Sequence, residues 1–408
     1  MKIIPGGVTA AKGFTVCSLR AGIKPGKTNR DMAMILSECD AVTAGTYTKN
    51  LVKAAPVKWD RNITENYETA RAVVVNTGIA NACTGIQGAK DCEATAEFTA
   101  EVLGLKKEEV FVASTGVIGK PLPMDVIKSG IPGLVNGLSD TEEASHLAAE
   151  AIMTTDTKPK FVACEFEIGG KTVRMGGMCK GSGMIHPNMG TMLGFITTDC
   201  AISKELLVKA LRASIEDSFN MISVDGDTST NDTVLILANG MAENEMIASE
   251  GENFDVFCKA LDEVTKCLAM KIAEDGEGAS RLFEVIVTGA KTDKDARILA
   301  KSVVTSSLTK AAVFGKDANW GRIMCALGYS GAEFDPDKAD ITLISEKGEE
   351  KLVENGVATT FSEEKATEIL SADKVTALCE LSDGSFTATA WGCDLTYDYV
   401  SINADYRS

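Results

Sequence analysis

A glycine-rich segment that leads into a threonine is the most chemically suggestive feature of this sequence. Residues 175–190 read MGGMCKGSGMIHPNMG, and Thr191 follows at the start of the apolar run TMLGFITT. A threonine hydroxyl is a weak nucleophile that needs a base. If the peptide bond before Thr191 is cleaved, the new α-amine, with a reference pKa of about 8, can accept the hydroxyl proton. From residue types alone, however, a Gly-Thr pair at the start of a buried strand is more often structural than catalytic.

Histidine, the commonest base in such chemistry, is scarce here. The only two histidines among the 408 residues are His146 and His186. His186 precedes Thr191 by five residues, on the far side of the proposed cut, so a Thr–His dyad is the alternative interpretation. His146 lies in an Ala/Glu-rich segment and is predicted to be a surface or packing residue. The scarcity is consistent with a threonine that uses its own amine as base.

The sequence lacks the motifs of other common catalytic, nucleotide-binding and metal-binding sites. The sequence has no phosphate-binding GxxxxGK[ST], no dinucleotide-binding GxGxxG, no HExxH and no GxSxG. Residues 225–232, DGDTSTND, lack the spacing and terminal glutamate of a calcium loop. The twelve cysteines include no CxxC pair, so we expect no structural metal site and no cofactor.

Composition narrows the class of protein further. The net charge of −17 disfavours nucleic-acid binding. No run of about 18 apolar residues could cross a membrane, and the start MKIIPGGV does not resemble a secretory signal. We therefore expect a cytoplasmic protein with reduced thiols. A length of 408 residues suggests two to three domains.

Strands and helices alternate around these residues. Predicted strands at 72–75 and 110–113 run into Asn76-Thr77-Gly78 and Ser114-Thr115-Gly116. Between them we expect a helix that buries Ala94, Phe98 and Val102, and we expect a second helix over 142–153. Residues 175–190, with five glycines and one proline, are expected to be the most irregular segment. Near the end, 375–381 and 386–391 read as two strands of a hairpin turning at Asp383-Gly384.

The segment KGSGMIHPNMGTMLGFITTD closely resembles the signature of the glutamate N-acetyltransferase family, also called ornithine acetyltransferase, which is cut just before its threonine. Further segments resemble this family in order along the whole chain: PGGVTAAKGF, NTGIANACTG, VASTGVIG, TTDTKPK, DGDTSTNDT, EGAS, FGKDANWGRI and INADYRS. Two positions depart from the family pattern. Gly190 replaces the usual alanine before the cut, which puts the cleavage rate in question, and Ala318 replaces a proline in what we expect to be a local turn.

The resemblance implies a role for each matching residue. Thr191 would be the nucleophile, created by cleavage between Gly190 and Thr191, and Thr115 with Gly116 would form the oxyanion hole. The residues implied to bind substrate, besides Thr191, are Thr157, Lys180, Glu277, Asn403 and Ser408.

The resemblance also implies the reaction. An acetyl group would move from N2-acetyl-L-ornithine to L-glutamate in a ping-pong cycle of arginine biosynthesis, through an acetyl-Thr191 intermediate. It leaves open whether acetyl-CoA is also a donor. Two other hypotheses are a self-processed amidohydrolase or aminopeptidase of related architecture, and a non-catalytic binding protein of the same fold.

The implied fold is α/β: an α-β-β-α sandwich with a smaller mixed α/β C-terminal domain. We place the sandwich at 1–287 and the smaller domain at 288–408, with the last residues returning to the active site. Cleavage would give chains 1–190 and 191–408, assembled as (αβ)2 or larger.

Overall fold

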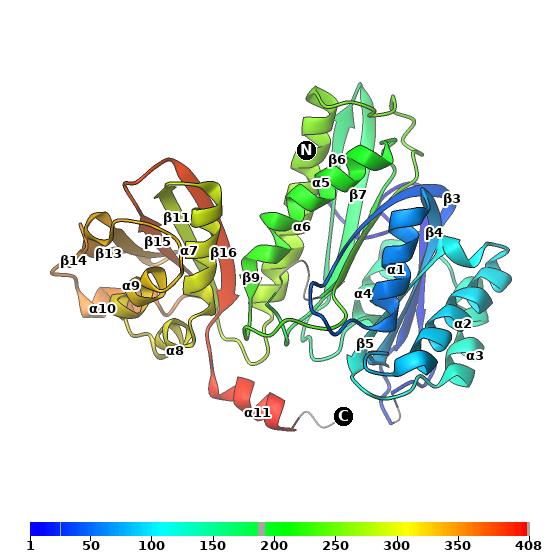
Figure 1. Ribbon diagram of the computed structural model, residues 1–408, viewed down its shortest axis with the longest axis horizontal. Coiled ribbons are helices and arrows are strands. Elements are labelled where there is room, and N and C mark those ends of the chain that lie inside the picture. The colour runs from blue at the N-terminus through cyan, green and yellow to red at the C-terminus, as the bar shows by residue number, and fades with distance from the viewer. Residues whose placement is uncertain (25, 187–191, 406–408) are drawn as a thin grey trace. The chain divides into compact units, whose positions relative to one another are not determined.

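The computed structural model describes residues 1–24, 26–186 and 192–405 (Figure 1). They form two compact units. The first comprises Met1–Gly181, Pro187–Asn220 and Thr228–Leu268, and the second comprises Ser182–His186, Met221–Asp227 and Ala269–Ser408. Each unit contains one sheet together with helices, so the predicted mixed α/β class is confirmed.

The first unit is built on a nine-stranded sheet, counted over the described residues, in the order β1-β6-β7-β8-β10-β3-β4-β5, with β2 paired to β3. Its strands are β1 (Lys2–Ile4), β2 (Phe14–Leu19), β3 (Met32–Tyr47), β4 (Thr69–Ile79), β5 (Val110–Val117), β6 (Lys160–Ile168), β7 (Lys171–Lys180), β8 (Leu193–Thr198) and β10 (Thr233–Ala238). Its helices are α1 (Ala55–Asn66), α2 (Gly85–Leu103), α3 (Met124–Asn136), α4 (Glu142–Ala151), α5 (Lys204–Glu216) and α6 (Glu252–Glu274), whose last turns belong to the second unit.

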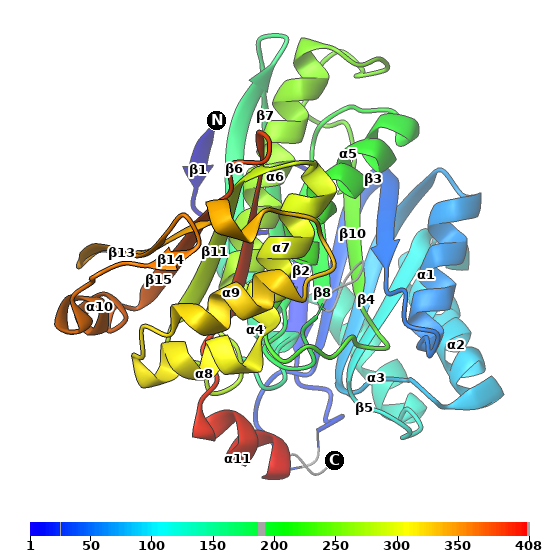
Figure 2. The same cartoon turned by 60° about the vertical axis from the view of Figure 1, so that its left-hand side comes forward.

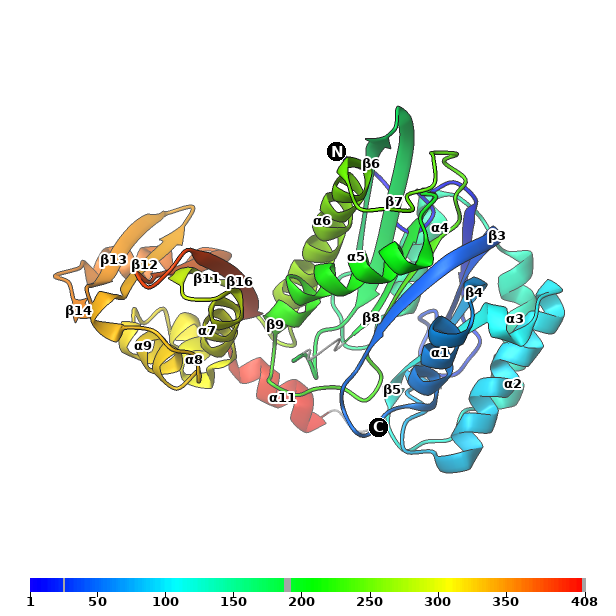
Figure 3. The same ribbon diagram turned by 45° about the horizontal axis from the view of Figure 1, so that its top comes forward.

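The long strand β3 joins two groups of strands (Figure 3). Its first half pairs with β2 and β4, and its second half pairs with β10. Inward side chains of both groups, such as Ile35, Phe111 and Phe195, share one buried core with α1 and α4. Helices α2 and α3 pack on the other face of β3, β4 and β5, whereas α6 lies against Gly177 of β7. This arrangement agrees with the predicted sandwich.

Helix α2 packs Phe98 and Val102 against the core as predicted, but its most deeply buried residues are others. Cys92, Thr95, Ala96, Thr99 and Ala100 are buried, whereas Ala94 and Phe98 are only half-buried. Small side chains let the helix approach the sheet closely. The pattern of large apolar residues therefore found side chains that contact the core but missed the small residues that are most buried.

The second unit is built on a seven-stranded sheet, again over the described residues, in the order β14-β13-β12-β15-β11-β16-β9. Its strands are β9 (Ile222–Ser223), β11 (Leu282–Ala290), β12 (Asp340–Ser345), β13 (Gly348–Glu354), β14 (Val357–Ala358), β15 (Lys374–Glu380) and β16 (Phe386–Cys393). Its helices are α7 (Asp293–Thr305), α8 (Ser307–Gly315), α9 (Trp320–Gly328), α10 (Glu363–Ile369) and α11 (Tyr397–Asp405), and Figure 2 shows α7 lying along the sheet.

The predicted boundary between 287 and 288 falls inside β11 and is wrong. Strand β11 belongs to the second sheet along its whole length, because it pairs with β15 on one side and β16 on the other. Cutting the chain there would leave the centre of that sheet in the other domain. The second unit therefore includes the chain from Ala269 onward.

The predicted hairpin at Asp383-Gly384 is also wrong. Strands β15 and β16 are not neighbours, because β11 lies between them. The backbone N–H groups of Asp383 and Gly384 both donate to the carbonyl of Gly289, at 3.0 and 2.8 Å. The turn therefore crosses the end of β11 instead of joining two paired strands.

None of the helices within 1–24, 26–186 and 192–405 is long and apolar enough to cross a membrane.

Candidate functional site

The expected oxyanion pair lies in the last residues of strand β5, not in a loop after the strand as predicted. Thr115 is 9% exposed, and Gly116 next to it has φ +128°. Strands β4 and β5 run parallel, with Thr77 opposite Thr115 and Gly78 opposite Gly116. A Cβ on Gly116 would lie 2.6 Å from the carbonyl oxygen of Gly78, so only glycine allows the strands to approach this closely.

The side chain of Asn231 ties the ends of β4 and β5 together. Its Nδ2 donates to the carbonyls of Ala80, at 2.6 Å, and Ser114, at 2.8 Å. Its Oδ1 accepts from the hydroxyl of Thr230 at 2.6 Å. Asn231 is 8% exposed, so these bonds form away from bulk water. They hold the residue immediately before Thr115.

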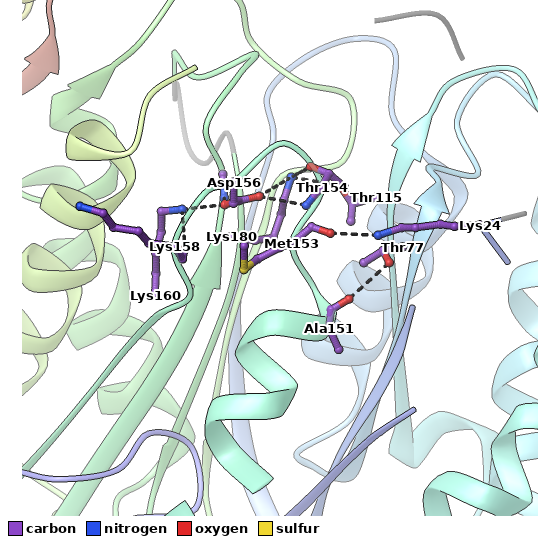
Figure 4. Close-up of polar contacts among 11 residues, drawn as sticks. Lys24, Thr77, Thr115, Ala151, Met153, Thr154, Asp156, Lys158, Lys160 and Lys180 are labelled. Carbon is purple, nitrogen blue, oxygen red and sulfur yellow. Dashed lines mark hydrogen bonds and ion pairs between the residues drawn. The ribbon is translucent and has the colours of Figure 1, made fainter. Parts of the chain in front are cut away.

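Lys180, at the end of β7, points at Thr115 near the end of β5 (Figure 4). It is 9% exposed, and its Nζ donates to the hydroxyls of Thr154, at 2.8 Å, and Thr115, at 3.4 Å. A Thr115 hydroxyl that accepts from Lys180 directs its own proton elsewhere. The geometry thus places a cation and a hydroxyl donor side by side.

A buried carboxylate anchors this cation. Asp156 accepts from Lys160 Nζ at 2.7 Å and from the Gly181 N–H at 2.6 Å, both at Oδ1, and from the Thr154 N–H at 3.0 Å. Lys180 Nζ lies 3.9 Å from its Oδ2. Burial raises the pKa of Asp156, but the two lysines and the hydrogen bonds outweigh it and lower this pKa to about 2. Asp156 is therefore ionised at neutral pH.

A further lysine lies near this cluster. Lys24 Nζ donates to the Met153 carbonyl at 3.1 Å, and Thr77 donates to the Ala151 carbonyl at 3.3 Å (Figure 4). Burial lowers the pKa of Lys24, and the charge of Lys180 adds to that effect. The end of α4 and the loop after it are thus tied to β4 and to the chain before β3.

Thr157 lies in the same loop as Asp156, between α4 and β6, and is exposed. The segment 175–190 is less irregular than predicted, because Met175–Lys180 belong to β7. Glycines at 176 and 177 suit that strand, since a Cβ at Gly177 would crowd Leu268.

Glu277 and Asn403 meet within the second unit. Asn403 of α11 donates from Nδ2 to Oε2 of Glu277 at 2.8 Å, and the Glu277 N–H donates to the Ser182 carbonyl at 2.9 Å. A Cβ on Gly183 would overlap the Glu277 carboxylate, so any other residue there would displace this side chain. Burial, Asp225 and Glu277 raise the pKa of Tyr399. Helix α11 is therefore bonded to Glu277 through Asn403.

The two histidines have local partners. His186 Nδ1 lies 3.1 Å from Ser223 Oγ, and burial, with a contribution from the charge of Lys301, lowers the His186 pKa to about 4. His146 is half-exposed, lies 3.6 Å from Glu150 and contacts the ring of Phe161. His146 is thus a surface residue with a packing contact, as predicted.

Gly190, Thr191 and Ser408 lie outside the described residues. Sequence reasoning missed Asp156, Asn231 and Lys24. Asp156 and Asn231 stand inside the quoted segments TTDTKPK and DGDTSTNDT, where acidic and amide side chains among small residues were a usable signal. Within the described ranges, no group of three or more His, Cys, Asp and Glu side chains could hold a metal ion.

Comparison with known proteins gives consistent matches. The ArgJ family model matches residues 15–408. The arginine biosynthesis bifunctional protein ArgJ of Caldanaerobacter subterraneus subsp. tengcongensis is 50% identical over 408 residues, covering 100% of both chains.

Among solved structures, ArgJ from Bacillus halodurans is 49% identical over 52% of this chain and 98% of that chain, with a TM-score of 0.49. Ornithine acetyltransferase from Mycobacterium tuberculosis, solved with ornithine, is 41% identical over 45% of this chain and 95% of that chain, with a TM-score of 0.42.

Proposed function

This chain belongs to the ArgJ family, an enzyme family of arginine biosynthesis, and on that premise we propose that it transfers acetyl from N2-acetyl-L-ornithine to L-glutamate. The observation that carries the proposal is the contact between Lys180 and Thr115, where β7 and β5 end. A substrate carboxylate and an acetyl oxygen developing negative charge both need donors of this kind.

The proposed nucleophile is Thr191, freed by self-cleavage after Gly190. Its α-amine takes the hydroxyl proton as Oγ attacks the acetyl carbonyl. The Thr115 hydroxyl and the Gly116 N–H donate to the oxyanion. The C–N bond of the substrate then breaks, the amine returns the proton to the departing ornithine nitrogen, and acetyl-Thr191 remains.

Glutamate completes the cycle. Its amine attacks the acetyl-Thr191 carbonyl and loses one proton, Thr191 Oγ recovers a proton, and N-acetylglutamate departs. Acetyl-CoA is proposed as a second acetyl donor for the same threonine, which would account for the word bifunctional in the names of relatives. No cofactor is required in this scheme.

Substrate-binding roles are proposed from the family motifs. Lys180 offers a cation to a carboxylate, and Thr157 is an exposed hydroxyl in the adjacent loop. Glu277 offers a carboxylate to a substrate ammonium, and Asn403, together with the terminal Ser408, offers hydrogen-bonding groups. The 2.8 Å contact between Asn403 and Glu277 supports a shared role for these two.

The position of the proposed cut supports a cleaved enzyme that stays together. Lys180 at the end of β7 is the register partner of Leu193 at the start of β8, in an antiparallel pair. Strand β8 also pairs with β10, and β10 pairs with β3. Chains 1–190 and 191–408 would therefore share one sheet, and we propose that they assemble as (αβ)2 or larger.

Intact mass and acetyl transfer test this proposal. The wild type should give two chains and form N-acetylglutamate from N-acetylornithine plus glutamate. Thr191→Ala should give one chain of 43.1 kDa and no transfer. Transfer of the acetyl group to water, giving free acetate, instead of to glutamate would favour the hydrolase alternative. Activity in an uncut wild type would exclude the α-amine as base.

A further inference from the structure

The buried carboxylate of Asp156 is flanked by two lysines that differ in how they reach it (Figure 4). Lys160 Nζ donates directly to Oδ1 at 2.7 Å and is 1% exposed. Lys180 Nζ lies farther away, 3.9 Å from Oδ2, and donates to the hydroxyls of Thr154 and Thr115 instead. Lys160 therefore makes the hydrogen-bonded ion pair with Asp156, and Lys180 makes a longer one without a hydrogen bond.

Backbone donors reinforce this division. The Gly181 N–H also donates to Oδ1, and the Thr154 N–H donates to Oδ2. These bonds fix the carboxylate between the loop after α4 and the end of β7. Its orientation is thus set by groups other than Lys180.

Formal charges show what Lys160 contributes. Asp156, Lys160 and Lys180 together carry a charge of +1, and without Lys160 they would carry zero. Burying a lysine at 1% exposure is costly, and one lysine already neutralises one carboxylate. The presence of Lys160 as well as Lys180 is explained if the charge of Lys180 is needed for something other than neutralising Asp156.

We propose that Lys160 is a positioning residue: by neutralising Asp156, it leaves the positive charge of Lys180 directed at a carboxylate of the acceptor amino acid. This inference rests on the proposed function for the identity of the ligand. Lys24, which lies in the same cluster, and Asp31, whose charge acts on Lys24, belong to the same electrostatic environment and stay unchanged in the test.

The test measures glutamate binding by titration calorimetry on purified full-length enzyme. Lys160→Met should raise the Kd for glutamate about tenfold or more, because Asp156 then draws on the charge of Lys180. The double variant Lys160→Met/Asp156→Asn restores the net charge of +1 and should return the Kd to within about threefold of wild type. Lys158→Met, an exposed lysine in the same loop, is the matched charge control and should leave the Kd unchanged.

A purely structural ion pair would behave differently. An unchanged Kd in Lys160→Met, or a double variant that binds no better than the single, overturns the proposal, as does a wild type that binds no glutamate. If Lys160→Met does not fold, the double variant alone decides by the same threefold limit. Normal binding with the expected Kd pattern but no acetyl transfer would refute the proposed function and leave this inference intact.

Discussion

Gly116→Ala tests whether the close approach of β4 and β5 shapes the candidate oxyanion site at the end of β5. The added Cβ would lie 2.6 Å from the carbonyl oxygen of Gly78, whereas ordinary contacts begin at 3.4 Å. The Gly78 carbonyl carbon would be nearer still, so the two strand ends would have to separate by at least about 0.8 Å. The alanine would also retain φ +128°, a backbone conformation that residues with a Cβ rarely adopt.

Gly119→Ala is the matched control. Gly119 also has positive φ, +83°, and follows the same strand, but a Cβ there meets nothing within 4 Å. It carries the backbone strain without the clash. We expect it to lose about 1 kcal/mol of unfolding free energy and to keep acetyl transfer within about threefold of wild type.

The magnitude for Gly116→Ala follows from geometry. Misplacing a reacting group by about 1 Å costs about 100-fold in rate. We therefore expect kcat/KM for acetyl transfer to fall about 100-fold, equivalent to about 2.7 kcal/mol of transition-state stabilisation. Loss of an oxyanion donor by mutation has a similar cost.

Steady-state kinetics of N-acetylglutamate formation, with urea unfolding of the same proteins, measures both quantities. Equal losses of activity in the two variants would show that backbone strain alone is responsible. Activity of Gly116→Ala within threefold of wild type would refute the role of the strand approach.

The remaining predictions concern four side chains. The pKa of Asp156 is about 2 against an ordinary 3.8, so its ionisation stabilises the fold above pH 4. The free energy of unfolding should fall by about 2 kcal/mol as the pH falls from 4 through 2. Urea unfolding of Asp156→Asn should lack this pH dependence. Asn231→Asp removes two N–H donors to buried carbonyls and should lower the free energy of unfolding in urea by about 2–4 kcal/mol. Acetyl transfer should fall at least about tenfold, and unchanged kinetics would contradict the role of Asn231 in holding the ends of β4 and β5. His186→Gln should leave the pH–rate profile between 5 and 8 unchanged, because its pKa is about 4, whereas a Thr–His dyad predicts a loss of over about 100-fold. Asn403→Ala should raise KM for N-acetylornithine about tenfold with little change in kcat, and a fall in kcat alone would contradict a binding role.

Local pattern was sufficient for the elements around the site. The strands before Ser114 and Asn76 are found where apolar runs predicted them, as β5 and β4. The helix before Thr154 is found as α4, with Thr141 accepting from the Ala144 N–H at its start. Apolar runs and capping residues act within a few residues of themselves, so they can be read without the fold.

The sequence pattern gave wrong predictions where segments distant in the chain determine strand pairing and packing. Asp383-Gly384 is a hairpin signal, yet β11 inserts between the two strands it joins. Helix α2 buries small residues because the sheet it meets lies close, and the sequence does not state that distance. The domain boundary failed for the same reason, since the partners of β11 lie about 90 residues later.

The amino-acid sequence by itself determined the family, the class of fold and the candidates Thr115, Gly116, Lys180, Glu277 and Asn403, because these depend on residue types in ordered motifs. Only the tertiary structure decided which of them touch, and that Asn231 bonds to the residue before Thr115 while Asp156 lies beside Lys180. A buried charge or amide must find partners wherever the fold supplies them, and those partners here come from segments up to 151 residues apart. The fold determines which partners these groups find, so the pairs do not occur at any fixed spacing along the sequence.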